Sequence, residues 1–307
     1  MPNTPTAPTY QSGTASVPAD GVGVAPEARG AALEFLGSLA AELSKGTVDL
    51  PCFPDVVVRI RHALADPATT IEKTVAIVGN EPRLAARLLQ MANSAALNPT
   101  GKPLTDLRSA ITRLGQRLVQ SAAVGYAVQQ MKYAGPLRSV TKPLTELWRE
   151  CIAVASISRA VATRTAVPPD EAFLTGLLHG IGRLYIMVRA IGHTEQFGDD
   201  RSFLDLVGDW HASIGKAVLE NWGFAEEMCE AVGEQDDYER RWIRGGELSD
   251  IIICSVALGA VLKNPTLQFG AASGISAFQH LRLTEADCTE VLAHAKQHLG
   301  SLHDALA

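Results

Sequence analysis

Apolar residues recur every three or four positions through most of this chain, from Leu33 to the C-terminal residues. This spacing places them on one face of a helix. No segment alternates apolar and polar residues between turn signals in the manner of a strand. Ala, Leu, Val and Ile supply most of the apolar side chains, and aromatic residues make up only 6% of the chain. The sequence therefore predicts an all-α protein.

Short polar residues, proline and glycine predict where individual helices begin and end. Thr69 and Glu72 have the spacing of a capping box, which predicts a helix that starts there. Asp106 is placed to cap a short helix that Gly115 closes, and Pro82 suits the first turn of another helix. These signals predict a succession of separate helices.

Changes in composition predict how the chain is divided. Residues 1–30 are rich in Pro, Gly, Thr, Ser and Ala and contain three charged residues, so they can bury too little to offset the cost of ordering their backbone. Gly135 and Pro136 interrupt the helical pattern. We therefore expect a disordered tail over 1–30, an N-terminal helical bundle over 31–135 and a second bundle, with the terminal helices, over 136–307.

Charge and cysteine content exclude several classes of function. The formal net charge is −6 at pH 7, whereas a dedicated nucleic-acid binder needs a clustered surplus of basic residues. The five cysteines are scattered and form no Cys-x-x-Cys pair, which indicates reduced, buried thiols. There is neither a signal-peptide pattern nor an apolar run of about 18 residues. We expect a cytoplasmic protein that binds neither nucleic acid nor membrane.

Four motifs follow one another in the part of the chain between about residues 50 and 260. They are Leu50-Pro51-x-x-Pro54, Asn80-Glu81-Pro82-x-Leu84-x-x-x-Leu88-Leu89-x-x-Ala92-Asn93-Ser94, Ala110-Ile111-x-x-Leu114-Gly115 and Ala172-Phe173-Leu174-x-Gly176-Leu177-Leu178-His179-x-Ile181-Gly182-Arg183-Leu184. In their order and spacing they resemble the HDOD family, a catalytically altered branch of the HD phosphohydrolase superfamily found in bacterial signalling. The resemblance implies two packed helical bundles, of which the C-terminal one is HD-like.

The resemblance also implies where a metal site would lie. In active HD enzymes a His, an adjacent His-Asp pair and a distant Asp hold a divalent metal that activates water. Cys151 occupies the place of the first His, His179 keeps the His of the pair, and Gly180 replaces its Asp. A thiol suits soft metals, whereas Mg²⁺ or Mn²⁺ prefers oxygen or imidazole ligands.

The remaining positions of this site have also changed. Glu234 and Gln235 stand where related sequences often carry two His residues, and residues 255–257 offer no Asp in the late helix. We therefore expect no metal, no cofactor and no catalytic residue. His179 is expected to pack or form hydrogen bonds in the core, and Cys151 to act as a small buried residue. His211, which resembles a position often retained in the family, is expected to anchor a helix contact.

Charged residues are unevenly distributed along the chain. Residues 101–142 contain seven Lys or Arg and one Asp, whereas residues 220–239 contain eight Asp or Glu and no Lys or Arg. These segments are either solvated helix faces or a polarised docking surface for another protein or a second copy. The residues that would form such a surface are Arg108, Arg113, Arg117, Glu226, Glu227 and Glu230.

The expected function is that of a stand-alone, non-enzymatic module of bacterial signal transduction, whose partners are other signalling proteins. The alternative is a divergent metal-dependent phosphohydrolase that acts on a nucleotide or cyclic dinucleotide with a rebuilt site around His179, His211 and Cys151. A third possibility is a sensor that binds a nucleotide without turnover.

Overall fold

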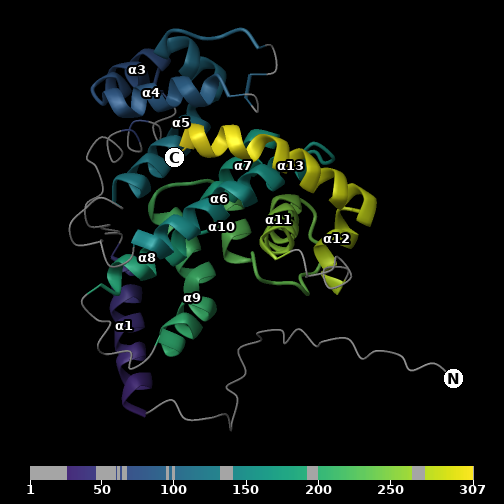
Figure 1. Cartoon of the computed structure of the whole chain (residues 1–307). Helices are drawn as coiled ribbons and strands as arrows, with labels where there is room; N and C mark the ends of the chain where they lie inside the picture. The colour runs from purple at the N-terminus through teal and green to yellow at the C-terminus, as the bar shows by residue number, and fades with distance from the viewer. Residues whose placement is uncertain are drawn as a thin grey trace, which may run out of the picture.

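The structure is a computed structural model that describes residues 26–45, 60, 63, 68–94, 97–98, 101–131, 141–191, 200–264 and 274–306. Within these ranges the regular elements are helices and no strand occurs, which confirms the predicted all-α fold (Figure 1). The helices are α1 (Pro26–Ser44), α3 (Ile71–Gly79), α4 (Pro82–Ala92), α5 (Leu107–Met131), α6 (Thr141–Ala162), α7 (Pro169–Leu178), α8 (Ile181–Arg189), α9 (Asp200–Asn221), α10 (Glu226–Gly233), α11 (Glu247–Lys263), α12 (Ser276–His280) and α13 (Glu285–Leu306).

Helix α5 connects an N-terminal group of helices to a larger bundle. It contacts α3 and α4 in the N-terminal group and α7 in the bundle formed by α6 to α11 (Figure 1). It bends at Gly115, where a φ of 73° interrupts the helix. The predicted helix end at Gly115 is therefore confirmed, and glycine suits it because no Cβ opposes a positive φ.

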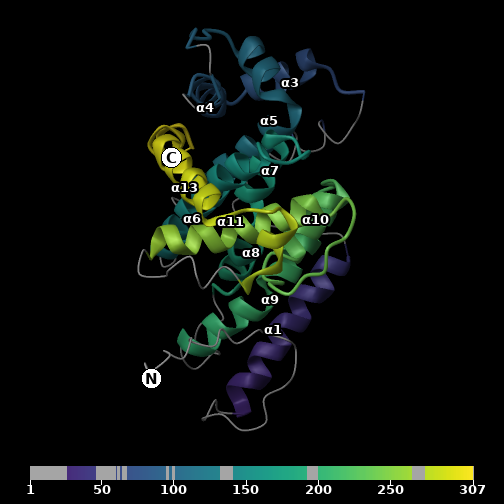
Figure 2. The ribbon, with the colours of Figure 1, turned by 90° about the vertical axis from the view of Figure 1, so that its right-hand side faces the viewer.

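The C-terminal helix α13 ties the two groups together. It contacts α4 and α5 on one side and α6 and α11 on the other (Figure 2). The guanidinium of Arg164, just after α6, lies 2.8 Å from Glu290 Oε2 and 3.6 Å from Asp287 Oδ1 of α13. The predicted C-terminal bundle thus includes a helix that also covers the N-terminal group. The boundary that we predicted at residues 135–136 lies outside the described residues.

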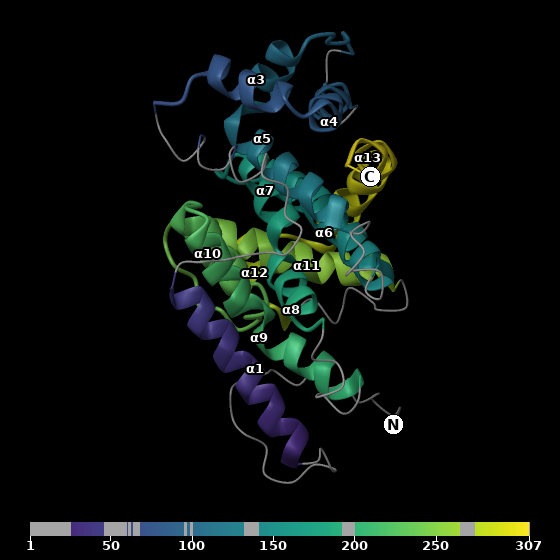
Figure 3. The ribbon, with the colours of Figure 1, turned by 90° about the vertical axis from the view of Figure 1, so that its left-hand side faces the viewer.

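Helix α1 is placed differently from the prediction. It begins at Pro26, so residues 26–30 are helical, whereas residues 1–25 of the predicted tail lie outside the described residues. Proline is well suited to this first helical position because it lacks an N–H that would have no partner there. The predicted bundle over 31–135 is also wrong for α1, which packs against α9 (Figure 3).

Specific contacts hold α1 on the C-terminal bundle. Glu42 pairs with Arg189 at 2.7 Å, and Asn221 Nδ2 donates to the carbonyl of Leu43 at 3.1 Å. Phe35 and Leu39 of α1 are buried. The apolar stripe of α1 is therefore covered by helices that lie more than 100 residues away in the chain, which local periodicity does not predict.

Side-chain caps begin several helices. Asp106 Oδ1 accepts a hydrogen bond from Ser109 N at 2.8 Å, which confirms the predicted cap of α5. The cap of α3 is Thr70, which accepts from Lys73 N at 3.2 Å, rather than the predicted Thr69. Thr69 is unavailable because its hydroxyl donates to the carbonyl of Ala63.

The core of the larger bundle surrounds α7, whose residues from Ala172 to Leu178 are all buried. Trp148, Phe173 and Leu177 are buried as predicted. Among the described residues, no helix combines the length and apolar character needed to cross a bilayer.

Candidate functional site

Two glycines allow the helices around Cys151, His179 and Gly180 to approach one another closely. We call these three residues the relic metal position, because they stand where the resemblance to HD enzymes implies the metal site. A Cβ at Gly182 of α8 would lie 1.8 Å from the carbonyl oxygen of His211 and 2.7 Å from Gly215 N, both on α9. A Cβ at Gly176 of α7 would lie 2.7 Å from Ser158 Oγ on α6. Side chains at these glycines would force the helices apart, so the glycines bring the segment that joins α7 to α8 against α6 and α9.

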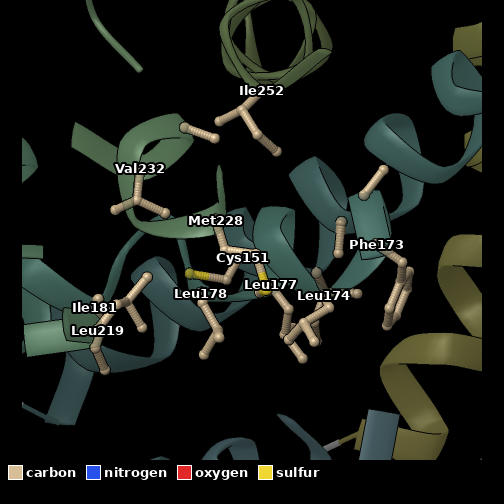
Figure 4. Close-up of a cluster of buried hydrophobic side chains, with 14 of the residues drawn as sticks. Cys151, Phe173, Leu174, Leu177, Leu178, Ile181, Leu219, Met228, Val232 and Ile252 are labelled. Atoms are coloured by element: carbon tan, nitrogen blue, oxygen red, sulfur yellow. The ribbon is translucent and has the colours of Figure 1, made fainter. Parts of the chain in front are cut away.

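Gly180 lies directly against Cys151. A Cβ at position 180 would lie 2.7 Å from Cys151 Sγ and 2.9 Å from Leu147 Cδ1. Cys151 is buried among the apolar side chains of α7, α8 and α10, as Figure 4 shows. The backbone of Gly180 has a φ of −84°, which any residue can adopt. A side chain here, such as that of an aspartate, would therefore require Cys151 and Leu147 to move.

His179 is completely buried between these helices. Its Nδ1 lies 2.7 Å from the carbonyl oxygen of Gly176, to which it donates, and its Nε2 lies 3.9 Å from Glu150 Oε1. Burial by itself lowers the pKa of His179, but the neighbouring Cys151 and Glu150 outweigh it and raise this pKa to about 9. These neighbours therefore favour the protonated form of the ring.

Five polar or ionisable residues gather here, and we call them the Glu150 cluster: Glu150, Cys151, His179, Arg183 and Asp236. Glu150 lies at their centre. Its Oε1 accepts a hydrogen bond from Arg183 Nη1, and its Oε2 lies 3.6 Å from Lys263 Nζ. The His179 ring lowers the pKa of Glu150 most, burial opposes it, and Arg183 adds to the lowering, so that the pKa is about 2. The Arg183 guanidinium thus supplies a fixed positive charge beside the relic metal position.

His211 joins α9 to the segment after α10. Its Nε2 lies 3.0 Å from Asp236 Oδ2, while its backbone carbonyl faces Gly182. Burial raises the pKa of Asp236, but the hydrogen bond from His211 and the nearby positive charges outweigh burial and lower it overall. The predicted anchoring role of His211 agrees with these two contacts.

Gln235 and Glu234 are both committed to contacts within the fold. Gln235 is buried, and its Nε2 donates to the carbonyls of His179 at 3.1 Å and Val232 at 2.8 Å. Glu234 Oε2 accepts from Arg240 Nε at 2.8 Å. These side chains therefore brace the end of α10.

A second buried network lies beyond α10. Arg240 Nη1 is 3.0 Å from Asp250 Oδ1, and His280 Nδ1 is 3.1 Å from the same oxygen. The late helix α11 thus does carry a buried Asp, outside the 255–257 segment where we looked for one. A carboxylate between Leu248 and an Ile-rich run was a signal of this site that sequence reasoning missed.

Glu150, Arg183 and Asp236 were also missed. Each is polar in a helical or loop sequence where a solvated face is the ordinary interpretation, so no local pattern marks it. Only the packing of α6, α8 and the α10–α11 connection brings them together.

Comparison with protein families identifies the fold. A model of the HDOD domain matches residues 50–238, more than half of the chain. The chain belongs to the HDOD domain family. The match ends shortly after α10, so helices α11 to α13 follow the family domain.

One sequence relative and two solved structures are similar to this chain at low sequence identity. An uncharacterized protein of Treponema pallidum is 22% identical over 205 residues, which span 63% of this chain but only 39% of that protein. A Shewanella amazonensis structure, whose name proposes a metal-dependent phosphohydrolase, is 22% identical with a TM-score of 0.69, covering 91% of this chain and all of that one. A Marinobacter aquaeolei structure, whose name proposes a signal transduction protein, is 21% identical with a TM-score of 0.59, covering 92% of this chain and 67% of that one.

The residues at the relic position do not fit the divalent metal of an HD enzyme. Cys151 offers a thiol where the resemblance to HD enzymes expects an imidazole, and a thiol is a poor ligand for Mg²⁺ or Mn²⁺. Gly180 contributes no side chain, and Gln235 is fixed to backbone carbonyls. Among the described residues, no group of three His, Cys, Asp or Glu has an arrangement that could hold a metal ion.

The predicted partner surface is only partly available. Arg108 pairs with Glu72 of α3, and Arg113 Nη1 donates to the carbonyl of Ala92 at the end of α4 at 3.3 Å. Both arginines thus contact the N-terminal group, although Arg108 remains exposed, and their part in a partner surface stays a prediction; the side chain of Arg117 lies outside the described residues. The acidic members, Glu226, Glu227 and Glu230, are exposed on α10.

Proposed function

We propose that this HDOD protein is a non-enzymatic protein-interaction module of bacterial signal transduction, acting in the cytoplasm. The observation that carries the proposal is the packing at Gly180, where even a Cβ would lie 2.7 Å from Cys151 Sγ and 2.9 Å from Leu147 Cδ1, so that the carboxylate of an HD pair would fit only if these side chains moved. The neighbouring residues support it, because Gly180 offers no ligand atom in a side chain and Gln235 Nε2 is bonded to the carbonyls of His179 and Val232.

The signalling context is supported by the family and by the name of the Marinobacter relative, which proposes a signal transduction protein. A module without turnover acts by contact, so its output passes to other signalling proteins or to a second copy of itself.

The second candidate is a metal-dependent phosphohydrolase of nucleotides or cyclic dinucleotides, or a sensor that binds them without turnover. The name of the Shewanella relative favours it, as does the gathering of Glu150, His179 and Arg183 beside Asp236. In a sensor, Arg183 and Lys263 would be the groups that attract a phosphate.

Metal analysis and phosphoesterase assays on the full chain distinguish these functions. We expect no stoichiometric Fe, Mn or Zn in the purified protein, and no hydrolysis of bis(p-nitrophenyl) phosphate or a cyclic dinucleotide above that of the His179→Ala variant. Turnover that depends on added metal and disappears in His179→Ala would contradict the proposal. A rise in melting temperature with a nucleotide, without turnover, would support the sensor instead.

A further inference from the structure

Two large apolar side chains are exposed next to each other in the connection between α10 and α11. Trp242 is 58% exposed and Ile243 is 56% exposed. Figure 2 shows this connection at the edge of the bundle, beside α10. A single exposed apolar residue is ordinary, whereas two adjacent large ones form a continuous apolar surface that a partner could cover. We call residues 241–244 the Trp242 loop.

Buried polar contacts hold the ends of this loop in place. Arg240, just before it, is 6% exposed and bonds to both Glu234 and Asp250. Ser276 of α12 donates from its hydroxyl to the carbonyl of Arg240 at 2.7 Å and from its N–H to the carbonyl of Tyr238 at 3.0 Å. The turn closes where Gly246 N donates to the carbonyl of Ile243 at 3.0 Å. A loop anchored in this way loses little conformational entropy on binding.

Exposed arginines flank the apolar pair. Arg241 and Arg244 are exposed, and neither forms an ion pair with a residue that the structure describes. Trp and Arg are the residue types that most often dominate binding energy in protein interfaces. The complementary partner surface is therefore an apolar surface with carboxylates beside it.

The same chain carries the complementary pattern at the start of α10. Phe224 and Ala225 are half-buried there, with apolar surface still exposed. Glu226, Glu227 and Glu230 are exposed beside them, and we call these three the acidic patch. Phe224 and Ala225 with the acidic patch are therefore complementary in charge to the Trp242 loop, and both surfaces contain apolar side chains.

We propose that the Trp242 loop of one copy docks on the acidic patch of a second copy. In a two-fold dimer the contact is made twice, because each copy presents both surfaces. A loop of four residues and a patch of three glutamates are smaller than the roughly 20–30 residues per side of a standard interface, so the dimer is weak and reversible. The dimer rests on the part of the proposed function that assigns this protein a role in protein interaction. It does not depend on the absence of catalysis, so catalytic activity would contradict the non-enzymatic function without contradicting the dimer.

Sedimentation velocity on the full chain, at protein concentrations up to about 0.5 mM, tests the proposal, because dimerisation depends on concentration. We expect the wild type to form dimers. Trp242→Ser, or Arg241→Glu with Arg244→Glu, should weaken dimerisation at least tenfold. Glu227→Lys with Glu230→Lys should weaken it similarly, and combining both charge reversals in one chain should restore it. Trp210→Ser, which removes another exposed tryptophan, is the matched control and should leave dimerisation unchanged.

Circular dichroism melting establishes that each variant folds. A wild type that remains monomeric over the whole concentration range would overturn the proposal, as would a dimer that Trp242→Ser leaves intact. Failure of the combined charge reversal to restore the dimer would overturn the assignment of the acidic patch. Cosedimentation with anionic phosphatidylglycerol vesicles that Trp242→Ser abolishes, without dimers, would assign the loop to a membrane surface instead.

Discussion

At the residue scale, one sulfur atom determines what can stand at position 180. The backbone there suits any residue, yet a Cβ would lie 2.7 Å from Cys151 Sγ. The space that a side chain at position 180 would occupy is therefore filled by the sulfur of Cys151. Gly180→Asp alone would place the new side chain against Cys151 Sγ.

We expect Gly180→Ala to lower the free energy of unfolding by about 1–3 kcal/mol, because it overpacks a closed core. Cys151→Ala should relieve most of that cost when the two changes are combined, since it removes the nearest atom. Urea denaturation of both single variants and the double variant gives the coupling energy. Free energies that add to within about 0.5 kcal/mol would show that the sulfur and the Cβ do not meet.

The charge on His179 makes stability depend on pH. The pKa of His179 is about 9 in the fold and 6.5 in its usual range, so the protonated ring stabilises the fold fully below pH 6.5 and loses this contribution as pH rises toward 9. We expect urea midpoints of the wild type to fall between pH 6 and 8.5, below the usual pKa of thiols. His179→Gln should show a flatter profile over this range. Equal slopes for the two proteins would contradict the assignment.

At the element scale, the contact between α8 and α9 is the closest in the bundle around the site. A Cβ at Gly182 would lie 1.8 Å from the carbonyl oxygen of His211, a backbone atom that cannot rotate away. The helices must separate if residue 182 carries a side chain. His211 and Asp236 would then lose their alignment.

Gly182→Ala should therefore destabilise more than Gly180→Ala, by more than about 3 kcal/mol, because a whole helix has to move. Gly208→Ala on α9 is the matched control: an added Cβ there meets nothing within 4 Å, and alanine should stabilise the helix by roughly 0.5–1 kcal/mol. Thermal denaturation of both variants measures the difference. A Gly182→Ala protein as stable as the wild type would mean that α8 and α9 are not in contact.

At the scale of the whole molecule, α5 and α13 connect the N-terminal group to the larger bundle. Helix α13 contacts helices of both groups, and α5 runs from one to the other. This arrangement favours a single cooperative unfolding transition. The four tryptophans, at positions 148, 210, 222 and 242, all lie in the larger bundle or its connections, so their fluorescence reports on that bundle alone.

We expect Leu84→Ala, on the fully buried face of α4, to lower the tryptophan-monitored stability by about 2–5 kcal/mol although no tryptophan lies in that group. Phe173→Ala should cost about 3–5 kcal/mol and leave one transition. Circular dichroism and fluorescence should then give the same midpoint. A fluorescence midpoint that Leu84→Ala leaves unchanged would mean that the halves unfold independently.

The sequence by itself determined the helical class, the cap at Asp106, the break at Gly115 and the family. These features depend on short-range backbone geometry and on the order of apolar motifs, which are written along the chain. The resemblance to the family also assigned Cys151, His179 and Gly180 to one site, because the family motifs lie in a known order.

Only the tertiary structure decided which side chains meet. Glu150 and Arg183 lie 33 residues apart in sequence, and Asn221 lies 178 residues from the Leu43 carbonyl that it binds. No local pattern carries such contacts, so the placement of α1 was predicted wrongly. In the same way, only the packing of α3 and α4 against α5 shows that Arg108 pairs with Glu72 and that Arg113 donates to the carbonyl of Ala92.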